Sequence, residues 1–531
     1  MIAGSLLFFA CLYRIPISDA DEGIIADGAE RIMRGQIPYR DFFSELGPAS
    51  FYLQAAIFRV VGESLTAIRM TAWVLGGILS GIVYLLSRRL LSRPAALVPT
   101  AAFTMICYPY AYRISHHWWG NLFLLLSILF LAGRNGRRVE SEGNPGKVHL
   151  GVAGALVAFT LLAMQSKGVW AVVMGAAYLI LAGRIARGQN WSQAAREGLK
   201  RSFWFLTSWV AVIILSVAYF QFRGALGAWV EDNFLFLFTN YRPYVDVPQS
   251  DPWLMVRRLA SIVQQQPSLH FVLYLAGYLF FAFIGPVVAF GGAAWRLRRD
   301  RSLNPARRVT LLLFLLLGIG AFLSEIHSPD FVHLVWGAPL MLILLTFEWR
   351  EAVHSRRTVV RRLATAGAVF ALMLMISTAG RKAANALKVS VPVETRRGTL
   401  YVAPEVAGET RRIIDDIQTL VPPGGETFFF PYHAELYFLT SARNPTRYDV
   451  LLDEFHSIRQ IDEAISTLQA RRPAYIFDLS RRLPWTIRPH FPDDQPDVTG
   501  PSRMERELLE PQTAYTRANE VAGMQVWVLK R

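Results

Sequence analysis

The chain contains little cysteine and little charge. Among its 531 residues there are 2 cysteines, Cys11 and Cys107, and only 18% of the residues are Asp, Glu, Lys or Arg. Both cysteines fall within apolar segments, where cysteine packs as a small apolar side chain, so a fold that depends on disulfide bonds is excluded. Soluble domains average about 25% charged residues, and the lower value here favours a protein that lies largely in lipid.

Long apolar runs account for the low charge. Apolar residues make up 53% of the chain, with 34 Phe and 14 Trp. A helix needs about 20 mainly apolar residues to cross the hydrocarbon core, so the expected fold class is a polytopic α-helical membrane protein with about 11 transmembrane helices. The predicted spans are 2–17, 65–87, 95–112, 117–133, 148–164, 169–183, 202–220, 269–295, 309–324, 331–348 and 359–379. The first run has no preceding Lys or Arg, which disfavours a cleaved signal peptide.

The positive charge is concentrated in the loops that follow every second span. The net charge is +15, which by itself could indicate a nucleic-acid partner. The loops 88–94, 134–147, 184–201, 296–308 and 349–362 together hold 23 Lys and Arg but 5 Asp and Glu. Loops rich in Lys and Arg remain in the cytoplasm, so the basic residues indicate topology and no nucleic-acid partner is expected. The chain is predicted to lie in the cytoplasmic (inner) membrane with 18–63, 221–267 and 380–531 on the outer face.

Two long outer loops interrupt the membrane domain, which is predicted to cover 1–379. In the first, 18–63, the apolar and charged residues of 20–35 fall on opposite faces of an amphipathic helix, and a second helix is expected from Pro48. These helices suit a position in the membrane interface. The loop 221–267 is rich in aromatic residues in the same way.

The sequence changes character at about residue 380. Strand-like runs at 426–431, 473–478 and 523–529 alternate with helical patterns at 405–420 and 456–471. This alternation predicts that 380–531 forms a small C-terminal α/β extracytoplasmic domain. The segment holds no Gly-rich phosphate loop and no nucleophile elbow, so no chemistry is assigned to it.

Three carboxylates follow the first apolar run, within Ser18-Asp19-Ala20-Asp21-Glu22-Gly23. Ser18 or Asp19 can cap the helix that follows, and acids near a helix N-terminus are favourable. The later acids Asp27 and Glu30 each have an Arg four residues on, whereas Asp21 and Glu22 have none at that spacing. Ionisable residues at a membrane boundary are functional candidates, so Asp21 and Glu22 are the candidate catalytic residues.

The first outer loop resembles that of the GT-C glycosyltransferases, in particular the group of protein O-mannosyltransferases and lipid A aminoarabinose transferases. The resemblance rests on Asp21, Glu22, Gly23, Ala29, Gly35, Gln36, Pro38, Tyr39, Asp41, Phe42, Gly47, Pro48, Tyr52, Gly62 and Arg69. It implies a polyprenyl-phosphate-linked sugar as donor, a glycan, lipid or protein acceptor, and inversion at the sugar. It also implies that Asp21 is the general base and that Glu22 assists it or orients the acceptor. Aminoarabinose transferases carry Lys-Pro-Pro where this chain has 43–48, so transfer to lipid A is not expected.

Cations and rings for a donor phosphate are expected from the same face. Arg113 and His116, next to His117, precede Trp118-Trp119, and an aromatic interface belt is the alternative explanation. Lys167 is the cation of an apolar hairpin and could instead snorkel to the interface. Two further candidates for donor binding, Tyr241 and Arg242, could equally form a surface turn.

A polar segment between the ninth and tenth spans completes the predicted site. His327, Asp330 and His333 are candidate donor-binding residues, since the resemblance places an Asp/His element near the donor. With Glu325 they could also hold a divalent cation, although their spacing matches no standard metal motif.

Two other functions remain open from the sequence. One is a transporter or lipid flippase without transfer chemistry, and the other is an assembly or sensor protein. Convergence of Asp21, Arg113, Lys167 and His333 on one outer cavity would favour transfer chemistry.

Overall fold

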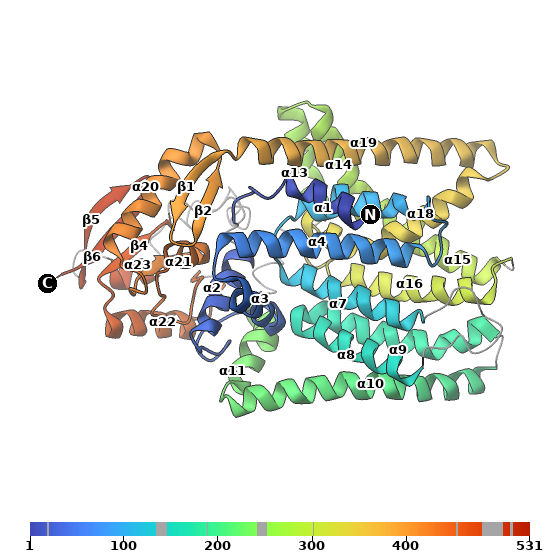
Figure 1. Cartoon of the computed structure of the whole chain (residues 1–531), viewed down its shortest axis with the longest axis horizontal. Helices are drawn as coiled ribbons and strands as arrows, with labels where there is room; N and C mark the ends of the chain where they lie inside the picture. Colours follow the sequence, from blue (N-terminus) through green and yellow to red (C-terminus); the bar gives the residue numbers. More distant parts are fainter. Residues whose placement is uncertain are drawn as a thin grey trace.

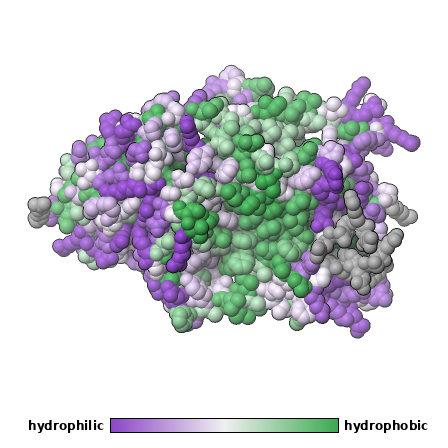
Figure 2. Space-filling view, viewed as in Figure 1, coloured by the Kyte–Doolittle hydropathy of each residue, from purple (hydrophilic) through white to green (hydrophobic). Residues whose placement is uncertain are grey.

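The computed structural model describes residues 1–17, 21–133, 146–187, 190–241, 252–300, 302–452, 455–480, 503–509 and 513–530. The molecule is elongated, with a bundle of long helices and a C-terminal α/β body at one end (Figure 1). A broad apolar band covers the helical bundle, and hydrophilic surface lies on both sides of it (Figure 2). This distribution is that of a multi-pass membrane protein, in which helices satisfy their own backbone hydrogen bonds in lipid.

Six helical stretches in the described part of the chain are long and apolar enough to cross a membrane. A seventh is added if α17 and α18, bent by 71° at their junction, form one broken span. The six are α4 (Leu65–Ser87), α9 (Gln165–Arg187), α10 (Trp191–Phe222), α16 (Pro305–Leu323), α19 (Thr358–Lys388) and the stretch Leu269–Arg299, which comprises α14 (Leu269–Leu279), η4 (Phe280–Ile284), η5 (Val287–Gly291) and α15 (Gly292–Arg299). The bent pair is α17 (Phe331–Gly337) and α18 (Pro339–Val353).

The remaining predicted spans are also helical, but they are shorter or interrupted. They are α1 (Ile2–Ala10), α7 (His116–Leu131), α8 (Lys147–Ala163) and the series α5 (Leu97–Ala102), η1 (Phe103–Cys107) and α6 (Tyr108–Tyr110). The polytopic helical fold class is therefore confirmed, and each of the predicted runs corresponds to helical structure.

Small residues allow the helices of the bundle to approach closely. A Cβ added to Gly154 of α8 would lie 1.9 Å from the backbone oxygen of Phe205 in α10. A Cβ added to Gly198 of α10 would lie 2.4 Å from the Cα of Ile180 in α9. Close backbone packing at small residues is the usual way in which membrane helices associate, because lipid provides no hydrophobic driving force between them.

The first outer loop forms α2 (Asp21–Met33) and α3 (Pro48–Val61), as predicted. Almost all of α2 is buried, and it packs on α3 and on α21 (Ala434–Thr440) of the C-terminal body. Arg31 in α2 lies 4.0 Å from its predicted partner Asp27, but its shorter ion pair, of 2.9 Å, is with Asp449 of the C-terminal body. Protein therefore encloses α2, and a position in the membrane interface remains a prediction for α3.

The C-terminal body contains two sheets and has the predicted α/β character. A hairpin of β1 (Val391–Thr395) and β2 (Gly398–Val402) precedes a four-stranded mixed sheet of order β3-β4-β6-β5. Its strands are β3 (Phe428–Phe430), β4 (Tyr475–Asp478), β5 (Tyr515–Val521) and β6 (Met524–Leu529), and its helices, besides α21, are α20 (Pro404–Leu420), α22 (Ile458–Arg471) and α23 (Arg503–Leu508). Since α19 continues to Lys388, the body begins later than the predicted boundary at residue 380.

The second outer loop contacts this body. It contains α11 (Leu226–Val230), η2 (Glu231–Leu235), η3 (Leu237–Tyr241) and α13 (Pro252–Gln265). Asp232 of η2 forms an ion pair of 2.9 Å with Arg447 of the C-terminal body. The basic connection between α18 and α19 lies at the opposite end of the molecule from that body (Figure 1). This arrangement agrees with the prediction that the loops rich in Lys and Arg and the C-terminal segment lie at opposite ends of the bundle.

Candidate active site

A cavity of about 1380 Å³ lies between the two outer loops, the helix ends and the C-terminal body. The sequence-predicted residues that line it are Asp21, Glu22, Arg113, His116, His327, Asp330 and His333. They come from α2, from the turn before α7 and the start of that helix, and from the turn between α16 and α17 and the start of α17. Residues separated by more than 300 positions in the sequence thus share one cavity wall.

Asp21 is the first residue of α2 and accepts a hydrogen bond of 3.1 Å from the Ser115 hydroxyl. Its Oδ2 also lies 3.4 Å from Nδ1 of His116. Burial alone would raise the pKa of Asp21, but His116 and then Arg113 outweigh burial and hold the pKa well below its usual range. The cavity therefore contains an ionised carboxylate that remains 22% exposed.

Glu22 has a different environment from its neighbour. Its side chain is 1% exposed, forms an ion pair with Arg69 of α4, and accepts a 3.1 Å hydrogen bond from the backbone N–H of Ile114. These contacts attach the start of α2 to α4 and to the turn that carries Arg113. Glu22 thus positions the wall of the cavity, and its predicted part in the reaction stays a prediction.

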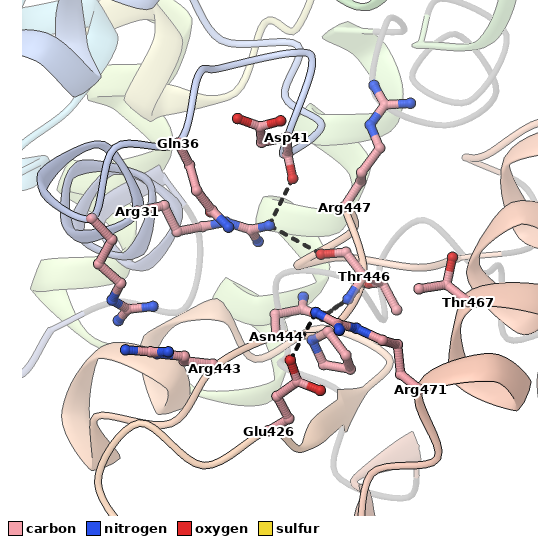
Figure 3. Close-up of a pocket in the computed structure, with 12 residues that line it drawn as sticks. Arg31, Gln36, Asp41, Glu426, Arg443, Asn444, Thr446, Arg447, Thr467 and Arg471 are labelled. Atoms are coloured by element: carbon pink, nitrogen blue, oxygen red, sulfur yellow. Dashed lines mark hydrogen bonds and ion pairs between the residues drawn. The ribbon is translucent and has the colours of Figure 1, made fainter.

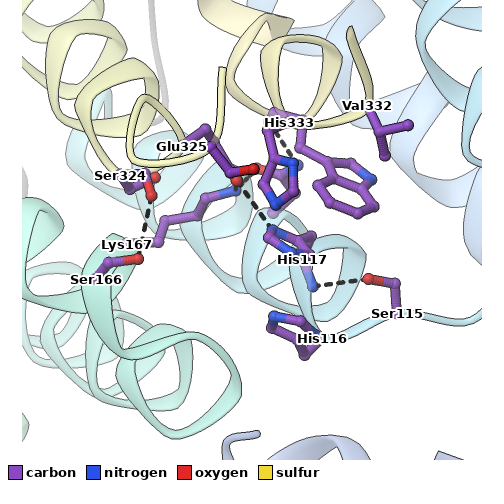
Figure 4. Close-up of polar contacts among 12 residues, drawn as sticks. Ser115, His116, His117, Ser166, Lys167, Ser324, Glu325, Val332 and His333 are labelled. Carbon is purple, nitrogen blue, oxygen red and sulfur yellow. Dashed lines mark hydrogen bonds and ion pairs between the residues drawn. The ribbon is translucent and has the colours of Figure 1, made fainter. Parts of the chain in front are cut away.

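Lys167 lies behind the cavity wall and is not among the residues that line it. Its ammonium is fully buried, 2.7 Å from Glu325 and 2.9 Å from the side-chain oxygen of Asn121. His117 approaches the same carboxylate at 3.0 Å, and Figure 4 shows His117 and Lys167 both pointing at Glu325. Burial would raise the pKa of Glu325, but the neighbouring His117 ring and the Lys167 ammonium outweigh it and lower the pKa.

The start of α17 places Asp330 and His333 on the wall of the cavity. Asp330 caps α17 by accepting hydrogen bonds from the backbone N–H groups of Val332 (2.7 Å) and His333 (3.0 Å). Its other oxygen lies 2.7 Å from Nδ1 of His333. The His333 ring is 5.3 Å from that of His117, which stacks on Trp336 at 3.6 Å. Capping, in addition to any role in the reaction, explains why an Asp occupies this position.

Two groups of side chains among the described residues could hold a divalent cation. One is Asp21, His116 and His117, and the other is His117, Glu325 and His333; within each group the candidate ligand atoms lie within 4.8 Å of one another. Nitrogen and oxygen ligands of this kind suit a transition metal. Lys167 already neutralises Glu325, so the first group is the better cation site.

Several residues of the cavity were not predicted from the sequence. They are Glu45 of the first outer loop, Arg258 of α13, Lys382 of α19, and Tyr432, Asp449, Val450, Leu452 and Phe455 of the C-terminal body. Lys382 follows the last predicted span. A lysine at this position is typical of the membrane interface, so the sequence did not single it out. Its ammonium lies 3.2 Å from the backbone oxygen of Tyr110, on the same side of the cavity as Arg113.

The last two predicted residues cannot be placed on the cavity. Tyr241 is the last residue of η3, but its side chain lies outside the described part of the structure. Arg242 lies outside the described residues altogether.

The chain is a polytopic membrane protein whose fold is similar to that of solved GT-C glycosyltransferases. ArnT from Cupriavidus metallidurans, bound to undecaprenyl phosphate, has a TM-score of 0.57 and 12% sequence identity, with 99% of this chain and 96% of that chain covered. The archaeal oligosaccharyltransferase AglB from Archaeoglobus fulgidus, in complex with an inhibitory peptide and a dolichol-phosphate, has a TM-score of 0.52 and 11% identity, with 90% and 68% covered.

The similarity is one of structure and not of sequence. Neither a search of known protein families nor a search of curated proteins finds a match to this chain. What the chain shares with the two solved structures is therefore the fold, and its chemistry has to be argued from its own residues.

Proposed function

We propose that this chain is an inverting glycosyltransferase that moves a sugar from a polyprenyl-phosphate donor to an acceptor hydroxyl on the outer face of the cytoplasmic membrane. The observation that carries the proposal is the position of Asp21 on the same cavity as the cations Arg113 and Lys382. A carboxylate and two cations are what the transfer requires, namely a proton acceptor and counter-charges for a phosphate.

The proposed reaction exchanges one bond to the sugar for another. The acceptor oxygen attacks the anomeric carbon and forms a new C–O bond, while the bond from that carbon to the phosphate oxygen breaks. Asp21 takes the proton of the acceptor hydroxyl, and the polyprenyl phosphate leaves with the bonding electron pair. An ionised Asp21 can accept the hydroxyl hydrogen bond before the attack, and the phosphate leaves readily, so a weak base suffices.

The cavity also offers an apolar environment for the lipid part of such a donor. Apolar side chains line it together with the polar groups, namely Val169 and Trp170 of α9, Ile262 of α13, Leu323 at the end of α16, and Ile326. Both structural neighbours, ArnT and AglB, are described with a polyprenyl phosphate bound, which supports a donor of this class. The outer-face location rests on the excess of Lys and Arg in the alternate loops.

The pH dependence of the reaction follows from the neighbours of Asp21. Replacing His116 by Gln removes the largest of the charges that lower the pKa of Asp21, so this pKa rises. We expect the acidic limb of the transfer rate to move to higher pH, since activity is lost as pH falls through the pKa of the base. Ser115→Ala, which removes a neutral hydrogen bond, is the matched control and should shift the limb less. An unchanged limb in His116→Gln would show that Asp21 does not determine it.

Lys382 is expected to act on the donor phosphate. We expect Lys382→Gln to raise the KM for the polyprenyl-phosphate sugar by roughly tenfold, because a charge-assisted contact to the phosphate is lost, with little change in the KM for the acceptor. Lys388→Gln, on the exposed end of the same helix, should leave both values unchanged. An equal rise in both KM values for Lys382→Gln would assign the residue to the shape of the cavity rather than to the phosphate.

The proposal is tested with purified full-length protein and a panel of radiolabelled polyprenyl-phosphate sugars. Release of polyprenyl phosphate with label in an acceptor supports it. The alternative, a membrane transporter or lipid flippase, predicts movement of intact labelled lipid across a proteoliposome membrane without cleavage. Flipping without cleavage across the whole panel would overturn the transferase proposal.

A further inference from the structure

A second cavity, of about 350 Å³, lies where the first outer loop meets the C-terminal body, and arginines dominate its lining. Roughly 300–1,000 Å³ is the usual range for small-molecule sites, so it has room for a small ligand. We call this cavity the arginine pocket. Its arginines are Arg31, Arg34, Arg443, Arg447 and Arg471. Against these five positive charges the lining contains two acids, Asp41 and Glu426. The pocket thus has an excess of positive charge.

Three of these arginines are engaged in the junction itself. Arg31 is buried against Asp449, and Arg447 is held by Asp232, each at 2.9 Å. Arg34 follows the last residue of α2 and forms an ion pair with Glu30, which also pairs with Arg397 of the C-terminal body. These residues build the pocket and keep the two parts of the chain together.

The other two arginines retain donors for a ligand. Arg443 has no ion-pair or hydrogen-bond partner for its guanidinium among the residues that the structure describes, and it is exposed. Arg471 reaches Glu426 at 3.0 Å but remains 59% exposed. Figure 3 shows both on the C-terminal body, across the pocket from Arg31, Gln36 and Asp41 of the first outer loop.

The frame of the pocket is held by hydrogen bonds. The side chain of Asn444 accepts from the backbone N–H of Thr446 at 2.8 Å and donates to the backbone oxygen of Tyr448 at 2.8 Å. The guanidinium of Arg31 donates to the backbone oxygen of Thr446 at 3.0 Å. A pre-formed frame lowers the entropy lost when a ligand binds. Planar guanidinium groups in such a frame match the two oxygens of a phosphate or carboxylate.

One ion pair links the lining of this pocket to that of the active-site cavity. Arg31 lines the arginine pocket, and its partner Asp449 lines the cavity that contains Asp21. We propose that the arginine pocket binds a phosphate or carboxylate group of an anionic glycan acceptor, whose hydroxyl then reaches the cavity. This inference rests on the proposed function and names the class of acceptor.

Direct binding tests the pocket without requiring transfer. In nanodiscs of neutral lipid, stabilisation of the full-length protein by inorganic phosphate and by glucuronate gives the apparent affinities. We expect Arg443→Gln and Arg471→Gln each to weaken both by roughly tenfold through loss of a charge-assisted contact, and Arg412→Gln, an exposed arginine of α20, to change neither. Asp21→Asn should bind both probes as the wild type does. Unchanged affinity in both pocket variants, or an equal loss in Arg412→Gln, overturns the site.

Kinetics then distinguish a group on the acceptor from free or lipid-borne anions. We expect Arg443→Gln to raise the KM for an anionic glycan acceptor by roughly tenfold without changing the KM for a neutral glycan or for the donor. Equal effects on the two glycans, or displacement of glucuronate by anionic lipid in the nanodisc, overturn the assignment to an acceptor. A wild-type protein that binds phosphate at the pocket but transfers no sugar refutes the proposed function and leaves the binding site standing.

Discussion

Replacing Asp21 by Asn is expected to reduce sugar transfer by roughly 10²–10⁴-fold, the usual effect of removing a general base. The amide keeps the size of the side chain and can still accept the hydrogen bond from Ser115, but it cannot take a proton from the acceptor. The rate is measured by single-turnover transfer from a radiolabelled polyprenyl-phosphate sugar. Because binding does not require the base, we expect the affinity for the donor to change little.

The matched control for this substitution is Glu63→Gln, in the same outer loop. Glu63 lies 3.1 Å from Arg397, does not line the active-site cavity, and is partly exposed. We expect this variant to transfer sugar at the wild-type rate and to express equally. Turnover of Asp21→Asn within a few-fold of the control would remove Asp21 as the base.

Replacing Lys167 by Met is expected to destabilise the fold by about 3–5 kcal/mol, because it removes one partner of a buried ion pair. Glu325 is 1% exposed and would keep only the ring of His117, 3.0 Å away, as a close partner. The measurement is the thermal unfolding of the purified protein in detergent. We expect donor and acceptor use to fall together, since the wall carrying His117 and His333 loses its support.

A double substitution separates support of the wall from direct contact with the donor. In Lys167→Met with Glu325→Leu no unpaired charge is buried, so much of the lost stability should return. If instead Lys167→Met keeps its stability and raises only the KM for the donor, then Lys167 contacts the donor phosphate, as the sequence predicts.

The membrane architecture could be predicted because it depends on local composition. The span 65–87 coincides with α4, and the helices expected at 20–35 and from Pro48 correspond to α2 and α3. Apolar length, helix periodicity and basic loops are properties of neighbouring residues. The strands at 473–478 and 523–529 were predicted for the same reason, although their order in the sheet was not.

The residues that line the cavity were predicted only where a charge stood out against an apolar background. Asp21, Arg113, His116 and His333 are conspicuous in this way, and they line one cavity. Lys382 is equally charged but stands at a span end, where lysine is ordinary. The roles of Lys167 and Glu22 depend on their partners Glu325 and Arg69, and neither partner is close in sequence.

The sequence by itself determined that the chain crosses the membrane repeatedly, that the alternate loops differ in charge, and that an acidic cluster follows the first apolar run. Only the tertiary structure decided how the two acids that begin α2 differ. Both line the cavity, but Glu22 is 1% exposed and paired with Arg69, whereas Asp21 is 22% exposed and lies beside His116. It also decided that the C-terminal body lines part of the cavity, where Asp449 pairs with Arg31 of the first outer loop. The physical reason is that pairing and burial depend on contacts between residues hundreds of positions apart, which no local pattern encodes.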